Sequence, residues 1–123
     1  MKLLVVDDEQ DVQLLFLQKF RKELRAGELE MDFAFSGEAA LEHLGQEEDP
    51  QRDLVLSDIN MPGMSGIDLL KIIKHRYPQL PVFMITAYGD EEYYTSAMEN
   101  GADDYIIKPI EFNQLKMKLS GIQ

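Results

Sequence analysis

Charged residues follow three of the short apolar segments in this 123-residue sequence. Asp7 and Asp8 stand at the end of the first segment, Asp58 follows the third, and Lys108 follows the fifth. If the segments are parallel strands, their carboxyl ends meet at one edge of a sheet, and the charged side chains converge there. Three converging carboxylates raise one another's pKa unless a cation lies among them. Mg²⁺ suits such a site, because it binds carboxylates and backbone oxygen and leaves positions open for a phosphate.

Lys108 and Thr86 could complete this cluster as a phosphate site. The ammonium group of Lys108 could neutralise Asp58 at rest and later hold a phosphoryl oxygen. The next residue, Pro109, admits a cis peptide bond that would aim the lysine inward. Thr86 ends the fourth segment and could donate its hydroxyl group. Acids also begin many ordinary loops, and a threonine at a strand end indicates little alone, so the interpretation depends on the combination.

Five strand–helix units are predicted to position these residues. Apolar segments typical of strands buried on both faces of a parallel sheet occupy residues 2–7, 31–35, 54–57, 82–86 and 105–107. Helices are expected between and after them, at about 11–27, 36–45, 65–74, 90–100 and 111–120. Strict alternation of strand and helix favours an α/β fold, a doubly wound parallel sheet with five helices on its two faces. Residues 46–52 are expected to form a polar loop, and residues 1–123 a single domain.

Charge and composition narrow the classes of partner. With 12 basic and 23 acidic residues the formal net charge is −11, so nucleic acid and anionic membrane surfaces would repel the chain. Cysteine is absent, which excludes disulfides and cysteine nucleophiles and is compatible with a reducing cytosol. The longest apolar runs are four residues, far too short to cross a bilayer. We therefore expect a cytoplasmic protein that contacts neither nucleic acid nor membrane by itself.

Four segments give the sequence a family resemblance over nearly its whole length, from Lys2 to about Leu119. It resembles the response-regulator receiver domain, the phospho-accepting module of two-component signalling, at Val5–Glu9, Asp53–Gly66, Ile85–Ala87 and Gly101–Pro109. The four segments in this order are highly specific together. The resemblance implies a flavodoxin-like, CheY-like sheet with strand order 2-1-3-4-5. The short last helix suggests a receiver domain excised from a longer regulator.

The resemblance also implies the metal site and the phosphorylated residue. Asp58 would take a phosphoryl group from the phosphohistidine of a sensor histidine kinase or phosphotransfer protein. Asp8 and Asp58 would bind Mg²⁺ directly, Asp7 largely through a water, and the backbone carbonyl of Asn60 would supply a further oxygen. The chain would catalyse its own phosphorylation and dephosphorylation without being a turnover enzyme.

Signalling would follow from contacts with the bound phosphoryl group. The resemblance implies that Thr86 and Lys108 hold its oxygens and that Tyr105 turns inward when Thr86 moves. Tyr105 would thereby change the face formed by the fourth helix, fifth strand and fifth helix, which a downstream effector domain or protein recognises. The same face would allow a transient homodimer, although a monomer is equally compatible. The ordinary role of a strand-end aromatic, packing on the core, remains an alternative for Tyr105.

Exposed apolar residues near the site leave further questions open. Tyr88 flanks the site in the family pattern, where a bulky ring could hinder water and slow dephosphorylation. Leu14 and Leu15 lie off the apolar stripe of the first helix, so they either dock a kinase's helical domain or are simply exposed. Tyr93 and Tyr94 are either contact aromatics or one buried and one exposed ring.

Two alternative functions remain. A receiver-like docking module would use the same fold without ever being phosphorylated, and the intact set of site residues argues against it. A phosphohydrolase with an aspartyl nucleophile would need an Asp-x-Asp-x-Thr motif after the first strand. The sequence there is Asp7-Asp8-Glu9-Gln10-Asp11, which lacks the threonine.

Overall fold

Five parallel strands form one sheet in the computed structural model, which describes residues 1–45 and 52–122. The strands are β1 (Lys2–Val6), β2 (Glu30–Ala34), β3 (Leu54–Asp58), β4 (Val82–Ala87) and β5 (Asp104–Lys108). Their spatial order is β2-β1-β3-β4-β5, and every neighbouring pair is parallel. The predicted fold class and strand order are therefore confirmed. The predicted polar loop falls, apart from Arg52, outside the described residues.

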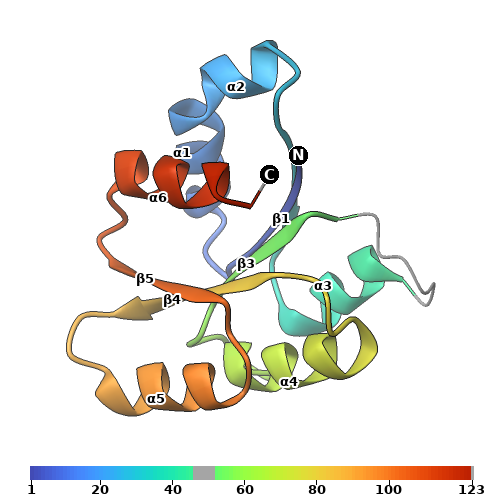
Figure 1. Cartoon of the computed structure of the whole chain (residues 1–123), viewed down its shortest axis with the longest axis vertical. Coiled ribbons are helices and arrows are strands. Elements are labelled where there is room, and N and C mark those ends of the chain that lie inside the picture. Colours follow the sequence, from blue (N-terminus) through green and yellow to red (C-terminus); the bar gives the residue numbers. More distant parts are fainter. Residues whose placement is uncertain (46–51, 123) are drawn as a thin grey trace.

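Helices cover both faces of this sheet. One face carries α1 (Asp11–Lys19), α2 (Arg21–Arg25) and α6 (Phe112–Ser120), and the other carries α3 (Gly37–Leu44), α4 (Gly66–Arg76) and α5 (Glu91–Glu99) (Figure 1). The side chain of Ser36 accepts a hydrogen bond from the Ala39 amide at 3.0 Å, and Ser65 accepts one from Asp68 at 3.2 Å. These serine caps start α3 and α4 close to the predicted positions. No described helix is long and apolar enough to span a membrane.

The first predicted helix is interrupted at Phe20, so the described ranges contain six helices and not five. Phe20 has φ −106° and ψ 18°, outside helical geometry. Its amide still donates to Phe16 O, and its carbonyl still accepts from Leu24 N, both at 3.0 Å. The interruption is thus a local distortion that keeps Phe16 and Phe20 in the core. The spacing of apolar residues is preserved across it, which is why the sequence pattern does not reveal it.

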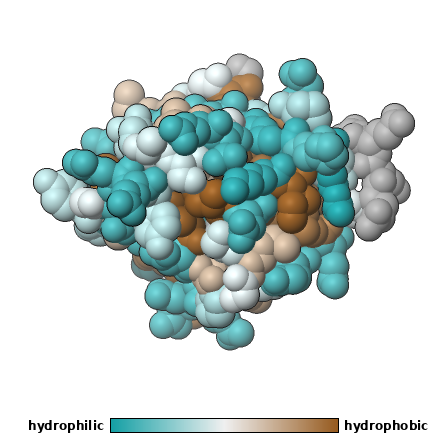
Figure 2. All heavy atoms as spheres, turned by 90° about the horizontal axis from the view of Figure 1, so that it is seen from below, coloured by the Kyte–Doolittle hydropathy of each residue, from teal (hydrophilic) through white to brown (hydrophobic). Residues whose placement is uncertain are grey.

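The core lies in two layers, one on each face of the sheet. Successive residues of a strand point to opposite faces, so each layer takes every second strand residue. Leu3, Val5, Leu54 and Leu56 pack with the α1 and α6 side, whereas Leu4, Val6 and Val55 pack with α3 and α4. Burial on both faces explains the continuously apolar central strands. Seen from the side of α4 and α5, apolar surface shows in a hollow between hydrophilic side chains (Figure 2).

Candidate functional site

The carboxyl ends of β1 and β3 bring three carboxylates together. Asp7 and Asp8 directly follow β1, and Asp58 is the last residue of β3. The two strands are neighbours, with Val6 opposite Ser57, so the residues that follow lie side by side. One carboxylate oxygen from each of the three aspartates lies within 4.8 Å of the others. This separation is compatible with a shared cation.

Lys108 extends from the end of β5 into the same cluster. Its ammonium nitrogen lies 3.2 Å from Asp58 Oδ2 and 4.0 Å from Asp7 Oδ2. The peptide bond between Lys108 and Pro109 is cis, the isomer that the sequence interpretation allowed. The lysine crosses the end of β4 to reach Asp58, because β4 lies between β5 and β3. One cation therefore faces two buried carboxylates.

The site leaves its carboxylates incompletely neutralised. Burial raises the pKa of Asp7, and repulsion from Asp58 and Asp8 raises it further. A hydrogen bond from the Glu9 amide to Asp7 Oδ1, 2.9 Å long, and the charge of Lys108 oppose this rise without cancelling it. Burial by itself lowers the pKa of Lys108, but attraction to the acids outweighs burial and raises it overall. The lysine stays charged at neutral pH, and an added cation would relieve the remaining repulsion.

Thr86, in β4, presents an unsatisfied hydroxyl group. Its Oγ1 atom is buried and has no hydrogen-bond partner among the residues that the structure describes. Burying a hydroxyl without a partner costs free energy, so such groups in folded proteins call for an explanation. A donor that awaits an acceptor oxygen from a bound group is consistent with this arrangement.

Comparison with known proteins places this arrangement in a family. The family model described as "Response regulator receiver domain" matches residues 3–120. The chain belongs to the receiver domain family. Domains of this family are signalling switches of two-component systems and broadly not turnover enzymes.

Individual relatives agree with this assignment. The response regulator FleR of Pseudomonas aeruginosa is 41% identical over 114 residues, which are 93% of this chain and 23% of FleR. PilR of the same organism is 38% identical over 117 residues, 94% of this chain and 24% of PilR. The receiver domain of NtrX from Brucella abortus is 34% identical with a TM-score of 0.83, over 98% of this chain and 96% of that one. The chain spans about a quarter of the length of FleR and PilR.

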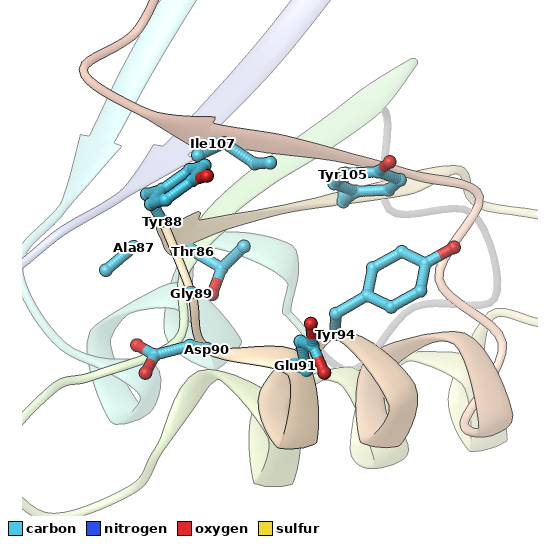
Figure 3. Close-up of a pocket in the computed structure, with 9 residues that line it drawn as sticks. All are labelled: Thr86, Ala87, Tyr88, Gly89, Asp90, Glu91, Tyr94, Tyr105 and Ile107. Carbon is cyan, nitrogen blue, oxygen red and sulfur yellow. The ribbon is translucent and has the colours of Figure 1, made fainter.

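In this receiver domain, Tyr105 shares a pocket with Thr86. The pocket has a volume of about 430 Å³ and lies between β4, β5 and α5 (Figure 3). The half-buried ring of Tyr105 meets the edge of Tyr94 at a centroid distance of 4.5 Å and an interplanar angle of 73°. Tyr88 lines the same pocket but is 86% exposed. Thr86 and Tyr105 thus face one space in which either side chain could move.

The loop at residues 59–65 follows Asp58 and contains Asn60, which is exposed. Gly66 fixes the end of this loop, since its amide donates to Ile59 O at 2.8 Å. A Cβ atom on Gly66 would collide with the carbonyl oxygen of Asp58. In the sequence Gly66 stands out only as part of a motif, with no predicted role of its own. A glycine at the start of a helix carries no chemical feature that would reveal this close packing, so the sequence gives no signal for it.

The predictions for the apolar residues on α1 and α5 can be compared with their exposure. Leu14 is 68% exposed and Leu15 39%, so both side chains are accessible to a partner protein. Tyr93 and Tyr94 are 41% and 38% exposed, so the interpretation of one buried and one exposed ring is wrong. The reason is that α5 buries only Ala97 among its nine described residues and leaves both rings at the surface.

Proposed function

We propose that Asp58 is the phosphoacceptor of this receiver domain. The observation that carries the proposal is the meeting of three carboxylates with Lys108 within a few ångströms. The cluster stands at the carboxyl edge of a parallel sheet, which is where ligands bind in folds of this kind. The unsatisfied hydroxyl of Thr86 supports the same proposal, because it supplies a donor for a phosphoryl oxygen.

The donor set fits Mg²⁺. Asp8 and Asp58 would bind the ion directly, Asp7 through a water, and Asn60 through its backbone carbonyl, all of them oxygen donors that Mg²⁺ prefers. The raised pKa of Asp7 supports a cation at this place, because burial and neighbouring acids disfavour its charged form. When bound, the ion would neutralise developing charge on the phosphoryl oxygens.

The reaction needs a nucleophile and positioned positive charge. An oxygen of Asp58 attacks the phosphorus of a phosphohistidine on a kinase or phosphotransfer partner, and an O–P bond forms as the N–P bond breaks. The electron pair of that bond stays on the histidine ring, which then takes up a proton. Lys108, 3.2 Å from Asp58 Oδ2 at rest, moves its ammonium group to a phosphoryl oxygen. Water later hydrolyses the acyl phosphate.

The signal then passes through Thr86 to the effector. The Thr86 hydroxyl donates to a phosphoryl oxygen, which draws β4 toward the site and enlarges the space beside Tyr105. Tyr105 turns into that space and alters the surface formed by α5, β5 and α6, which an effector domain or protein recognises. The partner kinase contacts the exposed Leu14 and Leu15 on α1, close to the acids that follow β1.

A phosphorylation assay tests the proposal. The chain is incubated with Mg²⁺ and a small phosphodonor such as acetyl phosphate, and its mass is measured. We expect one added phosphoryl group on the wild type and none on Asp58→Asn. Asp68→Asn, an exposed acid on α4, is the matched control and should behave as the wild type. An unmodified wild type would favour the docking-module alternative, and modification that survives Asp58→Asn would exclude Asp58 as the acceptor.

A further inference from the structure

The first turn of α3 holds the loop that carries Asn60. A Cβ atom on the buried Gly37 would lie 2.8 Å from Met64 Sδ and 3.0 Å from Met64 Cγ, so the helix backbone packs directly on the methionine. The Met64 amide donates a hydrogen bond to Glu38 Oε1 at 3.3 Å. Two successive residues of α3 therefore contact one residue near the end of the 59–65 loop.

The same turn of α3 is fixed relative to Asp7. The Asp7 amide donates to Ala34 O at 3.0 Å, which ties the end of β1 to the end of β2. Two residues later Ser36 caps α3 through its 3.0 Å hydrogen bond from Ala39. A continuous set of contacts therefore runs from Asp7 through the start of α3 to Met64. It connects the two segments from which the proposed Mg²⁺ ligands come.

We infer that Gly37 and Glu38 are positioning residues that set the affinity of the Mg²⁺ site by holding the 59–65 loop. The inference rests on the proposed function, because it takes the Asn60 carbonyl as a ligand. Mg²⁺ requires near-ideal octahedral geometry, so a small displacement of one ligand segment weakens binding. Gly66 holds the loop from the α4 side, and Met64 holds it from the α3 side.

Glu38 has two properties that substitution separates. Its carboxylate accepts the Met64 hydrogen bond, and its negative charge attracts cations at a distance. Glu38→Gln keeps an oxygen acceptor and removes the charge, whereas Glu38→Ala removes both. If position matters, Gln binds Mg²⁺ like the wild type and Ala binds it more weakly. If only charge matters, the two variants are equally impaired.

Calorimetric titration of the unphosphorylated chain with MgCl₂ measures the affinity directly. For Glu38→Ala we expect the Kd to rise about threefold, the value of one weak exposed hydrogen bond. Glu42→Ala, an exposed acid one turn further along α3, is the matched control and should leave the Kd unchanged. A wild-type Kd for Glu38→Ala, or an equal rise for Glu38→Gln, would overturn the role of Glu38.

Gly37→Ala gives a second and independent test. Alanine favours a helix over glycine by up to about 1 kcal/mol, so propensity alone predicts equal or greater stability in urea. The added methyl group must displace Met64, and we expect a several-fold weaker Mg²⁺ affinity at full folding. Adding Met64→Ala, which removes the Sδ and Cγ atoms in the way, should restore part of the affinity. An unchanged Kd in folded Gly37→Ala overturns the inference.

The outcomes separate this inference from the proposed function. If the wild type binds Mg²⁺ and is phosphorylated at Asp58, and the variants bind Mg²⁺ with the same Kd, only the positioning role is refuted. If the wild type binds no Mg²⁺, the metal site of the proposed function falls and this inference with it. Amide exchange at Met64 without any Mg²⁺ adds a readout of the loop alone, and it should be faster in Glu38→Ala than in Glu38→Gln.

Discussion

The two loops that flank Asp58 differ in how firmly the fold holds them. The loop after β3 continues into α4, of whose eleven described residues five are buried, and Gly66 locks its end against Asp58. The loop after β4 continues into α5, of whose nine described residues only Ala97 is buried. One side of the site is therefore built to keep its geometry, and the other has room to change it. A switch needs both properties, since metal binding requires fixed ligands and signalling requires a surface that moves.

Gly66→Ala should have the largest effect on stability, because it disturbs the firmly held loop after β3. The new methyl group collides with backbone at Asp58, and backbone cannot move aside as a side chain can. We expect the free energy of unfolding to fall by about 2–3 kcal/mol, measured by urea denaturation. The control is Gly121→Ala, where a Cβ atom would meet Lys118 O at 3.4 Å and should be accommodated. Wild-type stability of Gly66→Ala would mean that this loop yields easily and that the contrast is false.

Tyr94→Leu probes α5, which follows the loop after β4, and we expect a smaller loss of stability there. It removes the edge contact with the Tyr105 ring and keeps an apolar side chain, so the free energy of unfolding should fall by about 1 kcal/mol. Calorimetry should give an unchanged Mg²⁺ affinity, because none of the proposed ligands lies on α5. A weaker Mg²⁺ affinity in this variant would show that the two sides of the site are mechanically coupled at rest.

The central part of this architecture could be predicted from sequence because its causes are local. β1 and β3 are buried on both faces, so they are continuously apolar and easily found. The outermost strands differ from the prediction at their ends: β2 begins and ends one residue earlier, and β5 is one residue longer at each end, since residues at the margins of a sheet such as Glu30 and Asp104 need not be apolar. The bend at Phe20 leaves the apolar spacing intact and gives no signal.

The candidate site divides in the same way. Side chains at strand ends were predictable as neighbours, because the topology of a parallel sheet brings strand ends together and charge marks them in the sequence. The contacts of Gly37 and Gly66 were not predictable. A glycine required for close packing has no chemical feature that separates it from a glycine in a turn, so its neighbours become visible only in three dimensions.

Acid titration of the site gives a third and more modest prediction. The pKa of Asp7 is raised by burial above its ordinary value of 3.8, so the folded state binds the proton more tightly than the unfolded state. Its contribution to stability is therefore present at low pH and is lost as pH rises from about 3.8 through the raised value. Asp7→Asn removes this loss, and we expect a higher urea midpoint than wild type at pH 7 without Mg²⁺. Added Mg²⁺ should stabilise the wild type more than this variant.

The control for this titration is Asp68→Asn, which removes an equal charge from an exposed position on α4. Its urea midpoint should follow the wild type across the pH range. If the urea midpoint of Asp7→Asn depends on pH as that of the wild type does, the pKa of Asp7 is not raised in the folded protein. The raised pKa would then no longer support a cation beside Asp7.

Tyr88→Ala should have the smallest effect on stability, and it tests the loop after β4 directly. The ring is 86% exposed, so the free energy of unfolding should change by less than about 0.5 kcal/mol. Tyr88 lies in the loop after β4 and lines the same pocket as Thr86 and Tyr105, with its ring near Ile107 (Figure 3). In the proposed function its ring would screen a phosphoryl group on Asp58 from water. The half-life of the acyl phosphate should therefore shorten in Tyr88→Ala and be kept in Tyr88→Phe. Tyr93→Ala, which changes an exposed tyrosine on α5, is the control. An unaltered half-life of the acyl phosphate in Tyr88→Ala would mean that the Tyr88 ring does not limit the access of water.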